Sequence, residues 1–213
     1  MGAELLVDAY HALNVVPFSL RKEGLEGAYV VGGGYKYCEL GGGNAFLRFP
    51  ADTTLRPVVT GWFSEFADLA EVPKEGAVRY GAGPARFAGA TYDPTSHYRA
   101  AAVFAFFEEQ HLTPQRLREL SQHHVGLLAT KFDDLGLDPK LIDRDRSVPI
   151  SALGGFLALR TPHAERLCAA LKERGVSTDY RGSVLRLGPA PYVSDSQIAH
   201  AIDALSASPG KTR

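Results

Sequence analysis

Two short apolar runs near the N-terminus, each followed by polar or glycine-rich sequence, constrain the fold most strongly. Residues 5–7 predict a buried strand that ends on Asp8. A second apolar run, 28–31, leads through a glycine triplet to Lys36, and 44–48 predicts a third strand after another glycine triplet. Short apolar strands with longer connections between them are typical of an open α/β sheet.

The polar residues at these strand ends have a possible joint chemistry. A lysine just after a glycine run is partly desolvated and closely approached by backbone, which suits an amine to forming an imine with a carbonyl. An aspartate at the end of a neighbouring strand can hold a pyridinium nitrogen protonated. Taken singly, Asp8 is equally well explained as a cap or turn residue and Lys36 as a solvated surface residue.

The combined spacing is more specific than either residue. Asp8-x-x-His11 followed by Tyr35-Lys36-Tyr37 resembles the pyridoxal-phosphate enzymes of aminotransferase class V, and within them the kynureninases. The resemblance implies the C-terminal part of a fold-type-I enzyme, with an open, mostly parallel sheet in its large domain. It further implies pyridoxal 5′-phosphate as cofactor and Lys36 as the Schiff-base lysine. It also implies that Asp8 contacts the ring nitrogen and that His11 tunes the ring oxygen or the aspartate. Tyr37 is as well explained by packing. Two glycine triplets, 32–34 and 41–43, flank Lys36 and would let the backbone pack against the cofactor, although the second could instead be a hairpin loop.

Further positions match the family's cofactor- and substrate-binding residues. Tyr35 and Trp62 stand where the resemblance implies contacts to the cofactor phosphate, although a single tryptophan is more often a packing residue. Arg186, in an otherwise apolar strand, stands where the family binds the substrate α-carboxylate; an ion pair with Asp179 is the alternative. Kynureninases have a substrate-contacting Asn in the segment where this chain has Thr91, which becomes the candidate equivalent.

The rest of the chain predicts a linking segment and a small domain. We expect residues 1–95 to be a partial cofactor-binding large domain, 96–150 to be linking helices, and 151–213 to be a small α+β domain. The predicted helices are 96–110, 113–135 with a cap at Thr113 followed by Pro114, 161–175 with a cap at Thr161-Pro162, and 194–205. The predicted strands of the small domain are 155–159, 176–179 and 184–187.

Composition excludes several other classes of function. With 23 basic and 24 acidic side chains, a net charge of −1 gives no reason to expect nucleic acid or an anionic membrane as partner. The longest apolar runs are too short to cross a bilayer. Cys38 and Cys168 form no disulfide framework, which suits a reducing cytoplasm. His123 and His124 are adjacent on a predicted helix and point about 100° apart, so we expect no metal site.

The resemblance also defines what the sequence lacks. In the family, the half of the large domain that precedes the aspartate strand supplies a ring-stacking aromatic residue, a phosphate loop and a second aspartate. The three predicted strands alone would leave an unpaired sheet edge. We therefore expect a C-terminal subunit that assembles with a separately encoded N-terminal half. A non-catalytic scaffold or regulatory half-domain that binds this partner without chemistry is the alternative.

The reaction after removal of the α-proton stays open at this point. Hydrolytic Cβ–Cγ cleavage, β-elimination, desulfuration and transamination all use the same residues. Cys38 adjoins Tyr37 instead of lying in a mobile loop, which disfavours a desulfurase with a persulfide cysteine.

Overall fold

The computed structural model describes residues 3–72, 76 and 78–208. The chain divides into two compact units. The N-terminal unit comprises Met1–Tyr10 and Phe18–Phe106, and the C-terminal unit comprises His11–Pro17 and Phe107–Arg213. The sequence predicted a boundary near residue 95, whereas the units separate inside the helix α1 (Thr95–Glu109).

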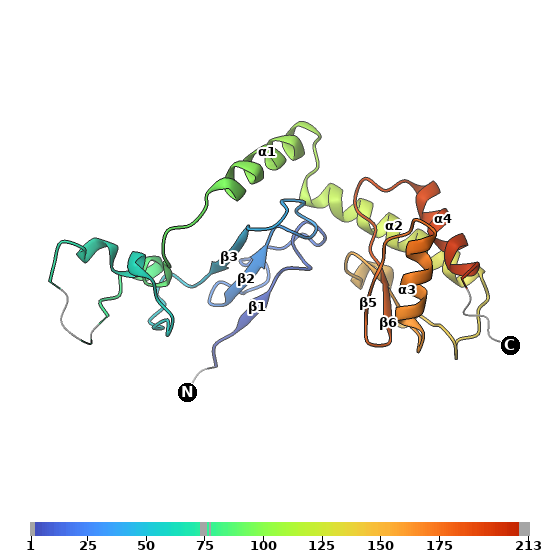
Figure 1. Ribbon diagram of the computed structural model, residues 1–213, viewed down its shortest axis with the longest axis horizontal. Helices are drawn as coiled ribbons and strands as arrows, with labels where there is room; N and C mark the ends of the chain where they lie inside the picture. Colours follow the sequence, from blue (N-terminus) through green and yellow to red (C-terminus); the bar gives the residue numbers. More distant parts are fainter. Residues whose placement is uncertain (1–2, 73–75, 77, 209–213) are drawn as a thin grey trace. The chain divides into compact units, whose positions relative to one another are not determined.

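The N-terminal unit is built on a sheet of three strands, which Figure 1 shows in blue. The strands are β1 (Leu6–Asp8), β2 (Tyr29–Gly33) and β3 (Ala45–Arg48), close to the predicted ranges. β1 pairs with β2 in parallel, so that Leu6 lies opposite Tyr29 and Asp8 opposite Val31. β3 runs antiparallel to β2. The second glycine triplet thus lies in a reversing connection, the hairpin-type alternative to a cofactor-packing role.

The glycines of this sheet accommodate close contacts with other parts of the unit. A Cβ on Gly33 would lie 2.6 Å from the ring of Tyr10 and 2.8 Å from the carbonyl oxygen of Asn44, and one on Gly34 would lie 2.4 Å from the side chain of Leu40. Gly41 adopts a φ of +66°, which favours glycine. The first triplet, expected to pack its backbone against the cofactor, therefore packs Gly33 and Gly34 against the chain itself.

The connection after β3 holds two short 3₁₀ helices, η1 (Trp62–Asp68) and η2 (Gly83–Phe87). α1 follows, and its first turn is anchored on the second glycine triplet. Asn44 donates to the carbonyl oxygen of Ser96 at 2.9 Å, and the hydroxyl of Ser96 donates to the carbonyl oxygen of Gly43 at 3.0 Å. Arg99 donates to the carbonyl oxygens of Leu40 and Gly42.

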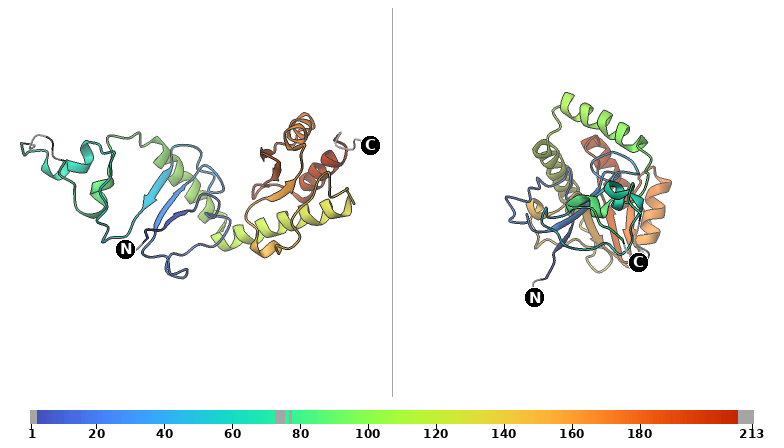
Figure 2. Two further views of the ribbon diagram at one scale, coloured as in Figure 1. Left: turned by 90° about the horizontal axis from the view of Figure 1, so that it is seen from below. Right: turned by 90° about the vertical axis from the view of Figure 1, so that its left-hand side faces the viewer.

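The C-terminal unit combines three helices and a 3₁₀ turn with a second three-stranded sheet, and the left view of Figure 2 shows this unit in yellow-green to red. Its helices are α2 (Pro114–Asp134), α3 (Ala164–Glu173) and α4 (Asp195–Ser206), and the turn is η3 (Ile150–Ala152). Its strands are β4 (Leu157–Arg160), β5 (Asp179–Arg181) and β6 (Val184–Leu187), in the antiparallel order β4-β6-β5.

Local sequence explains where these elements begin. The hydroxyl oxygen of Thr113 accepts from the amide of Arg116 and Pro114 opens α2, as predicted. α4 begins after a capping box formed by Ser194 and Gln197. The predicted cap at Thr161 is wrong, because Thr161 accepts from the amide of His163 and the helix starts only at Ala164.

The predicted strand 176–179 also starts later, at Asp179. The amide of Val176 donates to the carbonyl oxygen of Leu171 at 2.9 Å, and Gly175 has a φ of +78°. This turn ends α3. The amide of Val176 is therefore used by the helix end and is not available to the sheet.

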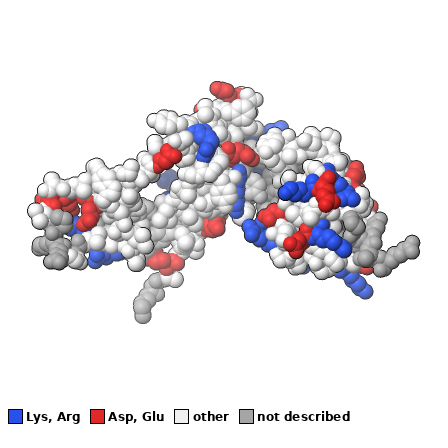
Figure 3. Space-filling view, viewed as in Figure 1, with Lys and Arg blue, Asp and Glu red and all other residues white. Residues whose placement is uncertain are grey.

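One contiguous apolar core holds the C-terminal unit together. It combines side chains from α2, α3, α4, β4 and β6, with Leu159, Leu171 and Leu185 fully buried. On its surface, acidic and basic side chains lie side by side, as on the face seen in Figure 3. Asp133, for example, pairs with both Arg144 and Arg146.

The segment His11–Pro17 belongs to this unit through a buried arginine. Arg118 of α2 donates to the carbonyl oxygens of Val15, Ser151 and Leu153 at 3.5, 2.6 and 2.9 Å. Val15 itself is buried. Across the described part of the chain, no helix combines the length and apolar character that a membrane span requires.

Candidate cofactor and substrate site

Asp8 and Lys36 follow two neighbouring strands at the same edge of the N-terminal sheet. β1 and β2 run parallel, and β1 ends on Asp8 while Lys36 comes three residues after the end of β2. The carboxyl ends of parallel strands meet at one edge, which is where open α/β sheets bind their ligands. The structure thus brings the predicted aspartate and lysine to one edge of the sheet.

A closed loop of backbone hydrogen bonds positions Lys36. The amide of Gly34 donates to the carbonyl oxygen of Asn44 at 2.7 Å, and the amide of Leu40 donates back to the carbonyl oxygen of Gly34 at 2.9 Å. Inside the loop, the carbonyl oxygen of Lys36 accepts from the amide of Glu39 at 3.0 Å. The lysine is half-buried and its backbone is fixed at both sides.

The amine of Lys36 faces two tyrosines. Its Nζ lies 5.6 Å from the ring centroids of both Tyr10 and Tyr35, within the range of a cation–π contact. The two rings lie 5.4 Å apart, and Tyr35 is exposed. Sequence reasoning selected Tyr35 and missed Tyr10. The signal available in the sequence was its position two residues after Asp8.

Asp8 uses only part of its carboxylate within the described chain. Oδ1 accepts from the amide of Tyr10 at 2.9 Å, which makes Asp8 the turn residue that the alternative interpretation expected. Among the described residues, Oδ2 has no hydrogen-bond partner. Asp8 is exposed, so an oxygen remains open to a protonated ring nitrogen. A lysine held at the same edge and this open oxygen fit one side of a pyridoxal-phosphate pocket.

The other predicted cofactor- and substrate-contacting residues belong to different elements of the chain. Trp62 opens η1 and packs against Phe63 and Phe66, with ring centroids 4.3 and 5.5 Å away, and is about half exposed. This is the packing role expected as its alternative. Thr91 is exposed in the loop before α1. His11 belongs to the C-terminal unit, where its ring lies 6.1 Å from that of Phe156.

Arg186 forms the ion pair that was its alternative assignment. In the β5–β6 register it lies directly opposite Asp179, and its Nη2 donates to Oδ2 of that residue. Its Cζ lies 5.5 Å from the ring centroid of Phe156. The predicted small-domain arginine is therefore flanked by an acid and an aromatic ring, and sequence reasoning missed the ring.

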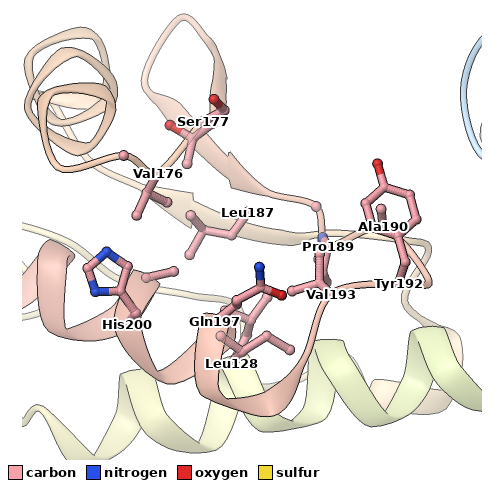
Figure 4. A pocket seen from close by; sticks show the side chains of 15 residues that line it. Leu128, Val176, Ser177, Leu187, Pro189, Ala190, Tyr192, Val193, Gln197 and His200 are labelled. Carbon is pink, nitrogen blue, oxygen red and sulfur yellow. The ribbon is translucent and has the colours of Figure 1, made fainter.

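A separate cavity of about 420 Å³ lies in the same unit (Figure 4). Leu128, Leu187 and Ile198 contribute apolar walls, and Gln197 and His200 contribute polar groups. Arg186 is not among the lining residues. Because side chains alternate along a strand, Arg186 projects from the face of β6 opposite to Leu187. The cavity is thus distinct from the predicted carboxylate site.

Cys38 is a poor nucleophile in this structure. It is buried, and burial raises the pKa of its thiol, with the charge of Glu39 raising it further. A thiol in such surroundings stays protonated and unreactive. In the described chain, no three His, Cys, Asp or Glu side chains gather as potential metal ligands.

Comparison with known proteins agrees with this arrangement. Residues 148–205 match the family model of the kynureninase C-terminal domain. A cysteine desulfurase from Thermococcus onnurineus NA1 superposes with a TM-score of 0.76 at 16% identity, over 96% of this chain and 52% of that one. The fold is that of the C-terminal half of a fold-type-I pyridoxal-phosphate enzyme. The fold class predicted from the sequence is confirmed.

Curated relatives support the same resemblance. The chain is 29% identical to a kynureninase of Bacillus anthracis over 88% of its own length and 43% of the relative. It is 26% identical to the uncharacterized aminotransferase YcbU of Bacillus subtilis (strain 168), over 97% of this chain and 52% of YcbU. The chain thus spans about half the length of the curated relatives that it matches. The predicted resemblance to kynureninases and class V aminotransferases, through their C-terminal half, is confirmed.

A further structural neighbour carries the expected cofactor. A C-DES variant with glycine covalently linked to its PLP cofactor superposes with a TM-score of 0.69 at 15% identity, over 92% of this chain and 49% of that one. Another structure of the same protein is described as a cystine C-S lyase. At these identities the neighbours establish the fold, and the reaction has to be inferred from this chain's own residues.

Proposed function

We propose that this chain is the C-terminal subunit of a kynureninase-like, pyridoxal-phosphate-dependent enzyme that acts on an amino acid together with a separately encoded N-terminal half. One observation carries the proposal. Asp8 and Lys36 follow two parallel strands at the same edge of the sheet, as a shared cofactor site requires. The two curated relatives are about twice as long as this chain, which supports the proposal of a second half.

Pyridoxal phosphate, when bound, supplies an electron sink for negative charge at the α-carbon of an amino acid. Lys36 would hold the group through Nζ and, as a free amine, accept the α-proton. Asp8, through its open Oδ2, would keep the proton on the ring nitrogen. His11 would tune the ring oxygen or the aspartate.

The remaining predicted residues would bind the two anionic ends of cofactor and substrate. Tyr35 and Trp62 would donate to the phosphate, and Arg186 to the substrate α-carboxylate. Thr91 would contact the substrate in place of the family's asparagine. The raised pKa of the buried Cys38 thiol favours cleavage or amino-group transfer over desulfuration.

The N-terminal unit exposes the apolar surface that such a partner would cover. Leu6 of β1 and Phe46 and Leu47 of β3 are 62, 44 and 45% exposed. The outer edge of β1 pairs with no other strand in the described chain. An unpaired edge flanked by apolar side chains is a template for a further strand, which the N-terminal half would supply.

The test measures cofactor binding by the chain alone and by the chain mixed with a separately encoded N-terminal-half polypeptide. We expect visible absorbance of lysine-bound pyridoxal phosphate only in the mixture, and borohydride to fix the cofactor on Lys36. Lys36→Ala should abolish both signals and leave the complex intact, because the lysine lies at the ligand edge and not in a strand.

Lys22→Ala is the matched control, since Lys22 is an exposed lysine of the same unit. It should leave absorbance and labelling unchanged. If the assembled complex never binds the cofactor, the enzyme assignment fails and the scaffold alternative is supported. A cofactor band with the chain alone would contradict the requirement for a second subunit.

A further inference from the structure

The ion pair between Asp179 and Arg186 has features of a ligand site already occupied by an internal carboxylate. The guanidinium of Arg186 uses a single nitrogen, Nη2, toward Asp179. Among the described residues, its Nε and Nη1 have no hydrogen-bond partner. A guanidinium can hold a carboxylate with two parallel hydrogen bonds, so the present pairing leaves its donor edge incompletely used.

The two partners differ in how firmly they are held. The side chain of Arg186 is 20% exposed, and its Cζ lies against the ring of Phe156. The side chain of Asp179 is 57% exposed and projects from β5, an edge strand of the sheet. An exposed carboxylate on an edge strand gives up its partner at small cost, whereas the arginine is held in place by its surroundings.

The charge of Arg186 acts on Asp179 in the expected direction. Burial alone would raise the pKa of Asp179, but the hydrogen bond and positive charge of Arg186, together with the backbone amide of Tyr180 and the charge of Arg181, lower that pKa overall. Asp179 is therefore ionised near neutral pH and competes with any other carboxylate for the same cation. A neutral ligand would gain little from displacing it.

We propose that Asp179 is a positioning and specificity-determining residue, which holds the guanidinium of Arg186 until the α-carboxylate of the substrate displaces it. This proposal rests on the assignment of Arg186 as the carboxylate-binding residue. The internal pairing keeps the cation oriented across the β5–β6 hairpin and lowers its affinity for weakly bound anions. A ligand that offers both carboxylate oxygens would use the donors that Asp179 leaves open.

The test follows the Nε–H resonance of Arg186 by NMR while the full chain is titrated with L-alanine or with L-alaninamide, which lacks the carboxylate. Asp179→Asn keeps the side-chain shape and removes the competing charge. We expect this variant to bind L-alanine about fivefold more tightly, which corresponds to ~1 kcal/mol, with no gain for L-alaninamide. Asp145→Asn is the matched control, because Asp145 pairs with Arg160 in the same unit.

A further variant separates failure of this inference from failure of the assignment beneath it. Arg186→Gln should abolish L-alanine binding, as followed on backbone amides of β6. If Arg186→Gln binds like the wild type, or if no variant binds L-alanine at saturating concentration, Arg186 is not the carboxylate site. If Arg186→Gln abolishes binding and Asp179→Asn leaves it unchanged or weaker, Asp179 is only a structural partner and the displacement is contradicted.

Discussion

The two units differ in how completely they bury their own apolar side chains. In the C-terminal unit, three helices cover the sheet and a single core runs from Val125 to Leu205. In the described chain, every large apolar side chain that is exposed belongs to the N-terminal unit, except Val16 and Tyr192. Val58 and Val59 are exposed to 99 and 89%.

This difference is what we expect if the N-terminal unit is one part of a larger domain. Burial of apolar area is the main favourable contribution to folding. A three-stranded sheet with apolar residues exposed on its outer strands gains little of it. We therefore expect the C-terminal unit to be stable on its own contacts and the N-terminal unit to need a further layer. The same unit carries Asp8 and Lys36, so completion of the fold and of the cofactor site are expected to coincide.

The largest expected effect comes from removing a core leucine of the C-terminal unit. Leu171 of α3 is fully buried, and Leu171→Ala should destabilise this unit by about 2–5 kcal/mol. Leu47→Ala, in the exposed outer strand of the other unit, should cost less than about 1 kcal/mol in the isolated chain. Denaturant-dependent hydrogen exchange measures both units separately. Equal costs for the two substitutions would remove the contrast.

A smaller effect is expected from the pH dependence of the stability of the C-terminal unit. Burial lowers the pKa of His124 below its ordinary value of 6.5, the neighbouring His123 lowers it further, and Asp195 partly opposes both. The unfolded chain then binds a proton more readily, so stability is present above pH 6.5 and is lost as pH falls through the folded pKa. Thermal melting between about pH 7.5 and about pH 5 measures this loss.

His124→Gln cannot be protonated in this range and should flatten the dependence. His200→Gln is the control, since His200 is exposed and its Nε2 lies 3.2 Å from the carbonyl oxygen of Arg174. If the pH dependence survives in His124→Gln but vanishes in His200→Gln, the proton binds at His200 and the assignment to His124 is contradicted. A matching slope in the N-terminal unit would mean that the two units are not thermodynamically separate.

The sequence predicted features that depend on neighbouring residues. Thr113-Pro114 set the start of α2, and the glycine-flanked segment around Lys36 marked the loop that the structure closes. The family resemblance implied a parallel sheet, and the parallel pairing of β1 and β2 brings Asp8 and Lys36 to one edge of it. These features could be predicted because caps, turns and motif spacing are local in the chain.

Other features depend on contacts between distant residues and could not be predicted. Tyr10 contacts Lys36 and Gly33, and the ring of Phe156 lies near both His11 and Arg186. The direction of β3 could not be predicted, because the glycine triplet 41–43 was compatible both with packing against a cofactor and with a hairpin loop. The roles of the predicted site residues themselves remain predictions until cofactor and substrate binding are measured.

The central claim is that the N-terminal unit is an incomplete half of a larger domain. Hydrogen exchange at the amides of β2 (Tyr29–Gly33), compared with β6 (Val184–Leu187), tests it most directly. In the chain alone we expect the amides of β2 to be protected from exchange at least ~100-fold less than those of β6. After addition of the N-terminal half, the protection of β2 should approach that of β6. Equal protection of both strands in the chain alone, unchanged by the second polypeptide, would contradict the claim.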